Sequence, residues 1–488
     1  IASMSKSMTT LACCILAAEG KLSFDDPVSK YFPNFRVPGN PQQDVTLRHL
    51  SMHTAGIPPM EPLEWSIALN TPGRDSEWAR EMKRTSPNKM ETIDQVIDYI
   101  ANCPYPTLGQ AGEYMSYSNE GYAILSYVVD IAAGVTLEEF LKERVFKPIG
   151  MTRSVLDLDG SEAIAMAGGN ITRLFEEDGE GGVSCDDHWS ILPPFRGCAC
   201  VKSTAHDMAR YYQCLSNRGM IDGVQAIPAE AVELLVGAGF PEQEKAFYCY
   251  GLNKRTKAGH VICEHSGGLH GVSSQGAFLK DENYGFVALC NQGDSDPEPL
   301  VWMMLNMVMG LPLEESHRWV HPAGEEFKEP EMLFGKYICH EGIPVTVDVF
   351  KEDGKLMARN DYGTMELTYC GGTWFSTRRL DTGALGRMHF LIRDGKAWGV
   401  QVYTRIYPPL GSAPSQKICI SANSGVKNGA SLSRTQRRRT PSHLRSGLWI
   451  VKRRVPCSVW QRNCASPTGR GFFCGFPGSP SAKSGMRR

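Results

Sequence analysis

The chain has 488 residues, of which 42% are hydrophobic, and this is enough apolar material for the cores of two or three domains. The longest apolar run, residues 300–309, is too short to cross a bilayer and contains Asn306, so the sequence predicts no transmembrane helix. The formal net charge of −2 hides an asymmetry, because no Asp or Glu follows Asp394 and residues 427–488 hold 14 of the 51 Lys and Arg residues.

Residues 1–312 alternate helical patterns with short strands, which predicts one α/β unit. A helix is expected over residues 9–18, where small and apolar residues run up to a glycine. Residues 60–90 are polar and irregular, and we expect them to form an insertion over one side of the unit. Two further helices are expected over residues 92–102 and 136–145, since each segment opens on a Thr with an acidic residue nearby.

Strands are expected toward the end of this unit. Adjacent antiparallel strands are expected at Glu264 and at residues 276–289. A turn at residues 281–283 divides the second of these segments. Together with the helices, they predict a central antiparallel sheet flanked by helices.

Beyond residue 312 the pattern changes. Residues 313–330 contain a stretch rich in Pro and Glu and are expected to form a linker. Residues 331–408 alternate valines with polar residues and contain two Asp-Gly turn signals, which predicts a small all-β, barrel-like domain. Residues 409–488 are rich in Ser, Gly, Pro and Arg without periodicity, so we expect a disordered basic tail, and its complete lack of acidic residues is typical of out-of-frame or non-native sequence.

The first candidate site residues stand at the start of the chain. Ser3 and Lys6 are three residues apart, hence on one face of a helix and within reach of each other. The positive end of a helix dipole favours a serine alkoxide, and an amine in a polar, partly buried cleft can accept the serine proton. Ser-x-x-Lys also arises by chance, so an ordinary helix cap is the alternative.

Two further motifs carry groups that could serve the same chemistry. Tyr117 and Asn119 lie in GEYMSYSNEGYAIL, where a phenol beside a lysine can relay a proton and an Asn amide can hold a substrate carbonyl. His265, Ser266 and Gly267 lie in CEHSGGLHG, where glycines let a substrate approach closely and a backbone N–H can point into an oxyanion hole. The alternatives are a supporting loop for the first motif and a strand bulge for the second. Because all three motifs occur in one domain-sized span, the catalytic interpretation is favoured.

Longer segments around these motifs resemble one family. They include LRHLSMHTAGIP, YSNEGYAILSYVVDIAAGVTLEEFLKERVFKPIGMTRS, VKSTAHDMARY and HSGGLHGVSSQGAFLKDENYGFVALCNQGD. These look like recurring segments of the serine β-lactamase-like and penicillin-binding-protein-like hydrolases, especially the class C, esterase and D-aminopeptidase branch. The resemblance covers about residues 1–312, and residues 331–408 look like the lipocalin-like domain that some members carry.

The resemblance implies the chemistry. Ser3 would be the acylated nucleophile, Lys6 its proton acceptor and Tyr117 the proton shuttle. The reaction would be acyl transfer to water through an acyl-enzyme, with no metal and no organic cofactor.

The resemblance also implies a binding site. Asn119 would orient the acyl group's amide, and His265, Ser266 and Gly267 would line the substrate. The backbone N–H groups of the nucleophile and of Gly268 would form the oxyanion hole.

Two departures from the family pattern matter. His265 stands where many relatives have a Lys in a Lys-Thr-Gly strand, and an imidazole that is neutral near pH 7 suits an ester or small peptide better than a carboxylate. Relatives normally carry a helix and two strands before the Ser-x-x-Lys helix, which are missing here. We therefore expect an N-terminally truncated chain with an open sheet edge, a loosely held Ser3 and weak activity.

The sequence thus predicts a serine hydrolase that acts on an ester, amide or β-lactam-like small molecule. The alternative is a catalytically inactive penicillin-binding-like or peptide-binding protein. No specific nucleic-acid partner is expected, because the basic tail indicates only electrostatic binding. The substrate and the oligomeric state stay open.

The cysteines give a further, weaker indication. Sixteen Cys without regular spacing favour a reduced compartment, and hence slightly the cytoplasm, although a signal peptide lost with the missing start is an alternative. Cys198 and Cys200, with His206 nearby, lack a second ligand pair at zinc spacing and are expected to line the core.

Overall fold

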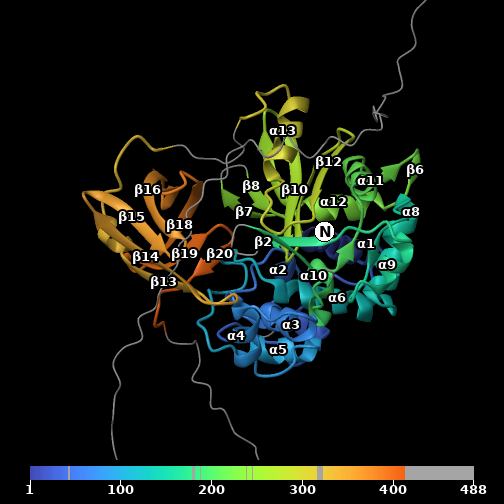
Figure 1. The fold of residues 1–488 in the computed structure, drawn as a ribbon, viewed down its shortest axis with the longest axis horizontal. Helices are drawn as coiled ribbons and strands as arrows, with labels where there is room; N and C mark the ends of the chain where they lie inside the picture. Colours follow the sequence, from blue (N-terminus) through green and yellow to red (C-terminus); the bar gives the residue numbers. More distant parts are fainter. Residues whose placement is uncertain are drawn as a thin grey trace, which may run out of the picture. The chain divides into compact units, whose positions relative to one another are not determined.

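The computed structural model describes residues 1–41, 44–177, 182–186, 188–237, 239–243, 246–315 and 322–412. Residues 316–321 of the expected linker and residues 413–488 of the expected tail lie outside the described residues. The described chain contains a mixed helix and strand region followed by an eight-stranded antiparallel sheet (Figure 1). The expected fold class is therefore confirmed, whereas the exact domain boundaries stay predictions.

The centre of the first region is a six-stranded antiparallel sheet in the order β12-β11-β10-β9-β8-β7. Its strands are β7 (Phe240–Gln243), β8 (Ala246–Tyr248), β9 (Asn253–Lys257), β10 (His260–Leu269), β11 (Val272–Leu279) and β12 (Tyr284–Cys290). Glu264 of β10 pairs with Ala277 of β11, and a turn joins β11 to β12. The antiparallel strands expected here are confirmed.

The two faces of this sheet carry different side chains because successive strand residues point in opposite directions. Ala277 packs with Trp302 of α13 (Glu298–Val308) on one face. Phe278 and Cys263 belong instead to the main core, which the other helices build. The sheet is therefore covered by helices on both faces, as the sequence predicts.

Helices and short strands surround the sheet. The helices are α1 (Ser5–Ala18), α2 (Leu47–Ser51), α3 (Pro62–Asn70), α4 (Glu77–Thr85), α5 (Ile93–Ala101), α6 (Asn119–Ala133), α7 (Leu137–Leu141), α8 (Lys147–Ile149), α9 (Ser161–Ala167), α10 (Arg196–Ala199), α11 (Ala205–Ser216) and α12 (Ala229–Gly237). The short strands are β1 (Val155–Leu156), β2 (Leu174–Glu177), β3 (Val183–Asp186), β4 (Val201–Lys202), β5 (Met220–Ile221) and β6 (Val224–Gln225). Within the described residues, no helix has both the length and the apolar character needed to cross a membrane.

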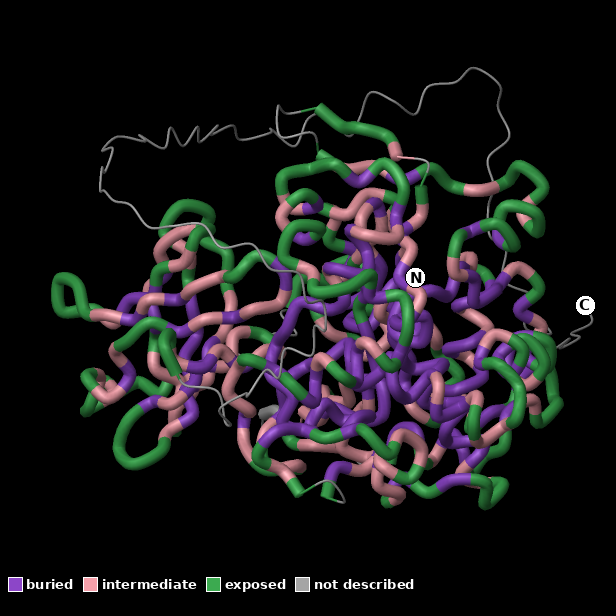
Figure 2. The backbone as a smooth tube through the Cα atoms, turned by 90° about the horizontal axis from the view of Figure 1, so that it is seen from below, coloured by how far each residue is buried: buried purple, intermediate pink, exposed green. Residues whose placement is uncertain are grey.

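Helix α1 is the central helix of the core. Residues 5–16 are all buried, and the helix packs against α6, α10 and α12. Such burial on all sides fits its small and apolar sequence. It starts before the expected residue 9 and ends as expected, with Gly20 following at φ +70°. Figure 2 shows buried backbone in the interior and exposed backbone mainly in peripheral loops.

The helix expected at residues 92–102 is confirmed by α5, and the one expected at residues 136–145 is confirmed by α7 together with the π-helical segment Lys142–Phe146 that continues it. Residues 60–90 are not irregular as expected. That segment contains α3 and α4, which bury Trp65 and Met82 among other residues. Helix α3 has no side-chain cap, and its apolar residues do not gather on one face, so its sequence lacks a helix signal. Helix α4 begins at a Ser76 cap, a local signal that the sequence-based prediction did not use.

The second region is a nearly closed barrel of eight antiparallel strands. They are β13 (Gly335–Cys339), β14 (Val345–Glu352), β15 (Lys355–Asn360), β16 (Gly363–Gly371), β17 (Trp374–Arg379), β18 (Leu385–Arg393), β19 (Lys396–Val402) and β20 (Arg405–Tyr407). The N–H of Ile338 donates to the Pro408 carbonyl at 2.9 Å, so the chain after β20 meets the first strand. The Asp353-Gly354 turn has positive φ at both residues, as a tight hairpin requires. The small all-β domain is confirmed.

Candidate active site

Ser3 lies in a short 3₁₀ turn, Ala2–Met4, that leads directly into α1. This start is held against the sheet, because Ala2 and Met4 are buried and Ser274 of β11 donates its hydroxyl to the Ile1 carbonyl at 2.9 Å. The expectation of a loosely held Ser3 is therefore not met. Ser3 itself is partly exposed and lines a cleft.

Lys6 lies one turn later, with its side chain completely buried. Its Nζ donates to Ser3 Oγ at 3.1 Å, to Asn119 Oδ1 at 2.9 Å and to the Cys198 carbonyl at 3.2 Å. An ammonium group has three donors, and these three acceptors use all of them. The amine is thus fixed beside the Ser3 hydroxyl.

Asn119 is the first residue of α6. The preceding Ser118 caps this helix, because its hydroxyl accepts the Gly121 N–H at 3.2 Å. The cap fixes where α6 begins and so places the Asn119 amide opposite Lys6. Asn119 is buried.

Tyr117 precedes that cap and packs beside the lysine. Lys6 Nζ lies 4.8 Å from the centre of the Tyr117 ring, and the His53 ring lies 4.2 Å away. The Tyr117 hydroxyl is buried and has no hydrogen-bond partner among the described residues. An unpartnered buried hydroxyl is uncommon, and it leaves the Tyr117 hydroxyl able to bond a further partner.

His265 takes part in a buried chain of hydrogen bonds. The Ser118 N–H at one end and the Ser266 carbonyl at the other end fix the direction of each bond. The Ser118 N–H donates to His53 Nδ1 at 3.0 Å, so His53 Nε2 carries the proton that it shares with the Tyr248 hydroxyl at 3.0 Å. The Tyr248 hydroxyl then donates to His265 Nε2 at 3.2 Å, and His265 Nδ1–H donates to the Ser266 carbonyl. Both ring nitrogens of His265 are therefore engaged by the protein.

The surroundings keep both histidines neutral. Burial, with a smaller contribution from the Lys6 charge, lowers the pKa of His265 to about 4. The same two causes hold the pKa of His53 well below its ordinary value. His265 therefore brings no positive charge to the site at neutral pH.

The glycines of β10 allow the strand to approach Ser3. A Cβ at Gly267 would lie 2.4 Å from the Ile1 carbonyl oxygen and 3.0 Å from the Ser3 nitrogen, so only glycine fits. A Cβ at Gly268 would meet open space, and Gly268 lines the cleft. The Ser266 residue is exposed on the same strand.

The cleft at Ser3 has a volume of about 910 Å³ and is also lined by Asn119 and Gly268. Carboxylates outnumber guanidinium groups among its charged lining residues, which are Glu64, Asp75, Glu176, Glu177, Asp186, Glu341, Arg74 and Arg405. Burial and the nearby Glu341 carboxylate raise the pKa of Glu64 to about 7. The cleft is net acidic.

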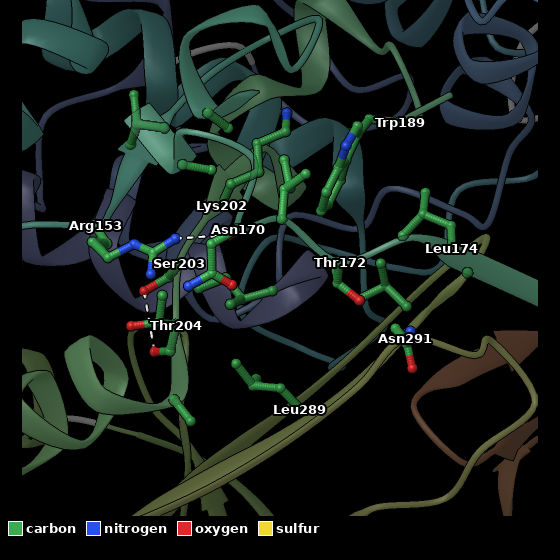
Figure 3. A pocket seen from close by; sticks show the side chains of 18 of the residues that line it. Arg153, Asn170, Thr172, Leu174, Trp189, Lys202, Ser203, Thr204, Leu289 and Asn291 are labelled. Carbon is green, nitrogen blue, oxygen red and sulfur yellow. Dashed lines mark hydrogen bonds between the residues drawn. The ribbon is translucent and has the colours of Figure 1, made fainter. Parts of the chain in front are cut away.

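A second cavity, of about 400 Å³, lies around Ser203 and Lys202 (Figure 3). Lys202 turns toward Trp189, with its Nζ 5.7 Å from the centre of that ring, and donates to the Asp157 carbonyl. The Ser203 hydroxyl bonds to Ser154 at 2.7 Å. The Lys202 amine is thus engaged by Asp157 and Trp189 rather than by the Ser203 hydroxyl, and the Ser3 cleft is the better candidate.

The structure therefore brings Ser3, Lys6, Tyr117 and Asn119 together and sets Gly267 against Ser3. His265 turns instead toward Tyr248.

Several residues at the site carried no signal in the sequence. His53 lies in the segment LRHLSMHTAGIP, but nothing in that segment indicates that its ring packs against Tyr117. Tyr248, Glu341 and Arg405 stand in other segments without a motif. Cys198 and Cys200 are buried in the core, as expected.

Comparison with known proteins agrees with this geometry. The family model described as Beta-lactamase matches residues 1–303. The chain belongs to the β-lactamase family. It is thus a β-lactamase-related, penicillin-binding-protein-like and D-aminopeptidase-like chain, in a family whose members include serine hydrolases.

Individual relatives are distant. Penicillin-binding protein 4* of Bacillus subtilis (strain 168) is 25% identical over 370 residues, 72% of this chain and 74% of that protein. A D-aminopeptidase of Gluconobacter oxydans (strain 621H) is 23% identical over 294 residues, which are 59% of this chain and 51% of that protein. The crystal structure of SurE shares the fold with a TM-score of 0.61 at 18% identity, covering 84% of this chain and 87% of that one.

Proposed function

We propose that this protein is a serine hydrolase that transfers an acyl group to water through an acyl-enzyme on Ser3. The observation that carries the proposal is the Lys6 amine, which lies 3.1 Å from Ser3 Oγ and is held there by Asn119 and the Cys198 carbonyl. A nucleophile with a base in hydrogen-bond reach, oriented in turn by a third group, is the arrangement that activates a serine.

In the proposed reaction Lys6 acts in its neutral amine form, whose nitrogen lone pair takes the hydroxyl proton while Ser3 Oγ attacks the acyl carbon. The backbone N–H groups of Ser3 and Gly268 stabilise the resulting oxyanion. The bond to the leaving group then breaks, and the leaving group receives its proton through the Tyr117 hydroxyl. Water attacks the ester on Ser3 by the reverse sequence, which releases the acid and restores the serine.

The charges of the site support a substrate class. A neutral His265 with both nitrogens engaged offers nothing to a substrate carboxylate, and the cleft around Ser3 is net acidic. We therefore propose acyl donors without a carboxylate near the scissile bond, such as an ester, an amide or a small peptide. A penicillin, which carries a carboxylate, should acylate Ser3 more slowly than an uncharged ester.

Intact-mass measurement tests the nucleophile. A fluorophosphonate should add one label to the wild-type protein and none to Ser3→Ala, while Ser161→Ala, a change at an exposed serine, should label normally. Labelling that persists in Ser3→Ala would refute the assignment. A wild-type protein that binds an ester or peptide reversibly but is never labelled would favour the inactive binding protein instead.

Two further variants test the proton transfers. Lys6→Ala and Tyr117→Phe should each slow acylation or deacylation by about 10²–10⁴-fold, the usual contribution of a positioned general acid or base. Stopped-flow hydrolysis of a chromogenic ester measures both steps. Rates near the wild-type value in both variants would contradict this mechanism.

A further inference from the structure

Two segments of the barrel reach the residues of the candidate active site. Glu341 follows β13, and Arg405 begins β20. Arg405 donates through Nε and Nη2 to the two carboxylate oxygens of Glu341, at 2.6 Å and 2.8 Å. Such a two-bonded guanidinium–carboxylate pair fixes the orientation of both side chains. Both residues are partly buried and line the cleft next to Ser3.

The Glu341 carboxylate also determines which way the Asn119 amide faces. Asn119 Nδ2 donates to Glu341 Oε1 at 3.0 Å, while Asn119 Oδ1 accepts from Lys6 at 2.9 Å. Lys6 meets the amide as an N–H donor and a carboxylate can only accept, so a flipped amide would face two mismatched partners. Glu341 thereby holds Asn119 in the orientation that binds Lys6.

Arg405 and its neighbours hold Tyr117. The Arg405 guanidinium lies 4.3 Å from the centre of the Tyr117 ring, on which a cation packs favourably. The Thr404 carbonyl accepts the Tyr117 N–H at 2.8 Å, and the Ile406 N–H donates to the Ser116 hydroxyl at 3.2 Å. The backbone and the ring of Tyr117 are therefore both anchored by the barrel.

We propose that the barrel is a working part of the active site, in which the Glu341–Arg405 pair positions Asn119 and Tyr117 for reaction at Ser3. This inference rests on the proposed function. Glu341 and Arg405 are positioning residues, since they act through Asn119, Lys6 and Tyr117. The barrel would then be required for turnover even though none of its residues is the nucleophile.

Single substitutions at the pair test this role. Glu341→Ala removes the partner of the Asn119 amide, and Glu341→Gln keeps the shape and an acceptor oxygen while removing the charge that pairs with Arg405. Misplacement of a reacting group by about 1 Å can cost about 10²-fold in rate. We expect kcat for a chromogenic ester to fall about 10–100-fold in Glu341→Ala and less in Glu341→Gln, with KM changed less than about threefold.

The matched control is Glu366→Ala. Glu366 lies in the same barrel and pairs with Lys355 at 2.9 Å, but this pair is exposed and lies on β15 and β16. We expect its kcat and melting temperature to stay at the wild-type values, because exposed ion pairs contribute little to stability.

The outcomes separate the possibilities. A fall in kcat with an unchanged melting temperature, partly rescued by Glu341→Gln, supports the proposal. An unchanged kcat in Glu341→Ala overturns it, as does a fall in kcat that only accompanies a lower melting temperature. If Glu341→Ala does not fold, Glu341→Gln alone decides, because an unchanged kcat there overturns the positioning role. Failure of the proposed function is recognised independently, by fluorophosphonate labelling that survives in Ser3→Ala.

Discussion

Lowering the pH from 7 to 5 should remove about 2 kcal/mol of the free energy of unfolding through His265 alone. In the native state burial and the Lys6 charge keep this histidine neutral down to a pKa of about 4, whereas an unfolded chain takes up the proton near pH 6.5. Between these values the unfolded state binds more protons, so stability falls as the pH falls. Below pH 4 the full loss is about 3 kcal/mol. His53, whose pKa is lowered for the same reasons, adds to the loss with the same sign.

Urea denaturation at pH 7 and at pH 5 measures this loss. His265→Gln should be less stable than the wild type at pH 7, because it disturbs the hydrogen bond to Tyr248, but should lose about 2 kcal/mol less between the two pH values. An equal loss in the wild type and in His265→Gln would refute the reasoning, because His265 would then bind its proton equally in both states.

Gly267→Ala should lower the melting temperature, at a cost of about 1–3 kcal/mol, because the added Cβ would collide with the Ile1 carbonyl, whereas Gly268→Ala should be tolerated. If scanning calorimetry gave Gly267→Ala and Gly268→Ala the same melting temperature, this would show that β10 can move away from the chain start. Tyr248→Phe should raise the pKa of His265, because it removes the hydroxyl that donates to the neutral ring. A histidine NMR titration measures the change, and a pKa still near 4 would mean that burial and Lys6 set it without the tyrosine.

The sequence predicted much of the fold because its signals are local. Helix-starting Thr residues, Asp-Gly turns and strand alternation each depend on a few neighbouring residues, and the structure has α5, the barrel hairpins and the β10–β12 strands where they were expected. The same locality explains the error at α3. Six of its nine residues are buried against the rest of the protein and no side chain caps its start, so little in the local sequence marks it as a helix. Helix α4 is mostly exposed and starts at a Ser76 cap, a local signal that the sequence-based prediction did not use.

The sequence by itself also indicated the family and the main candidates at the site, because Ser3 and Lys6 lie three residues apart and Tyr117 and Asn119 stand together in one short motif. Only the tertiary structure decided the rest. It turned His265 toward Tyr248, which lies in another strand, and it brought Glu341 and Arg405 from the barrel onto Asn119 and Tyr117, more than 200 residues away. Such contacts join segments with no shared spacing or pattern, so they follow from the packing of the whole chain and not from any motif within it.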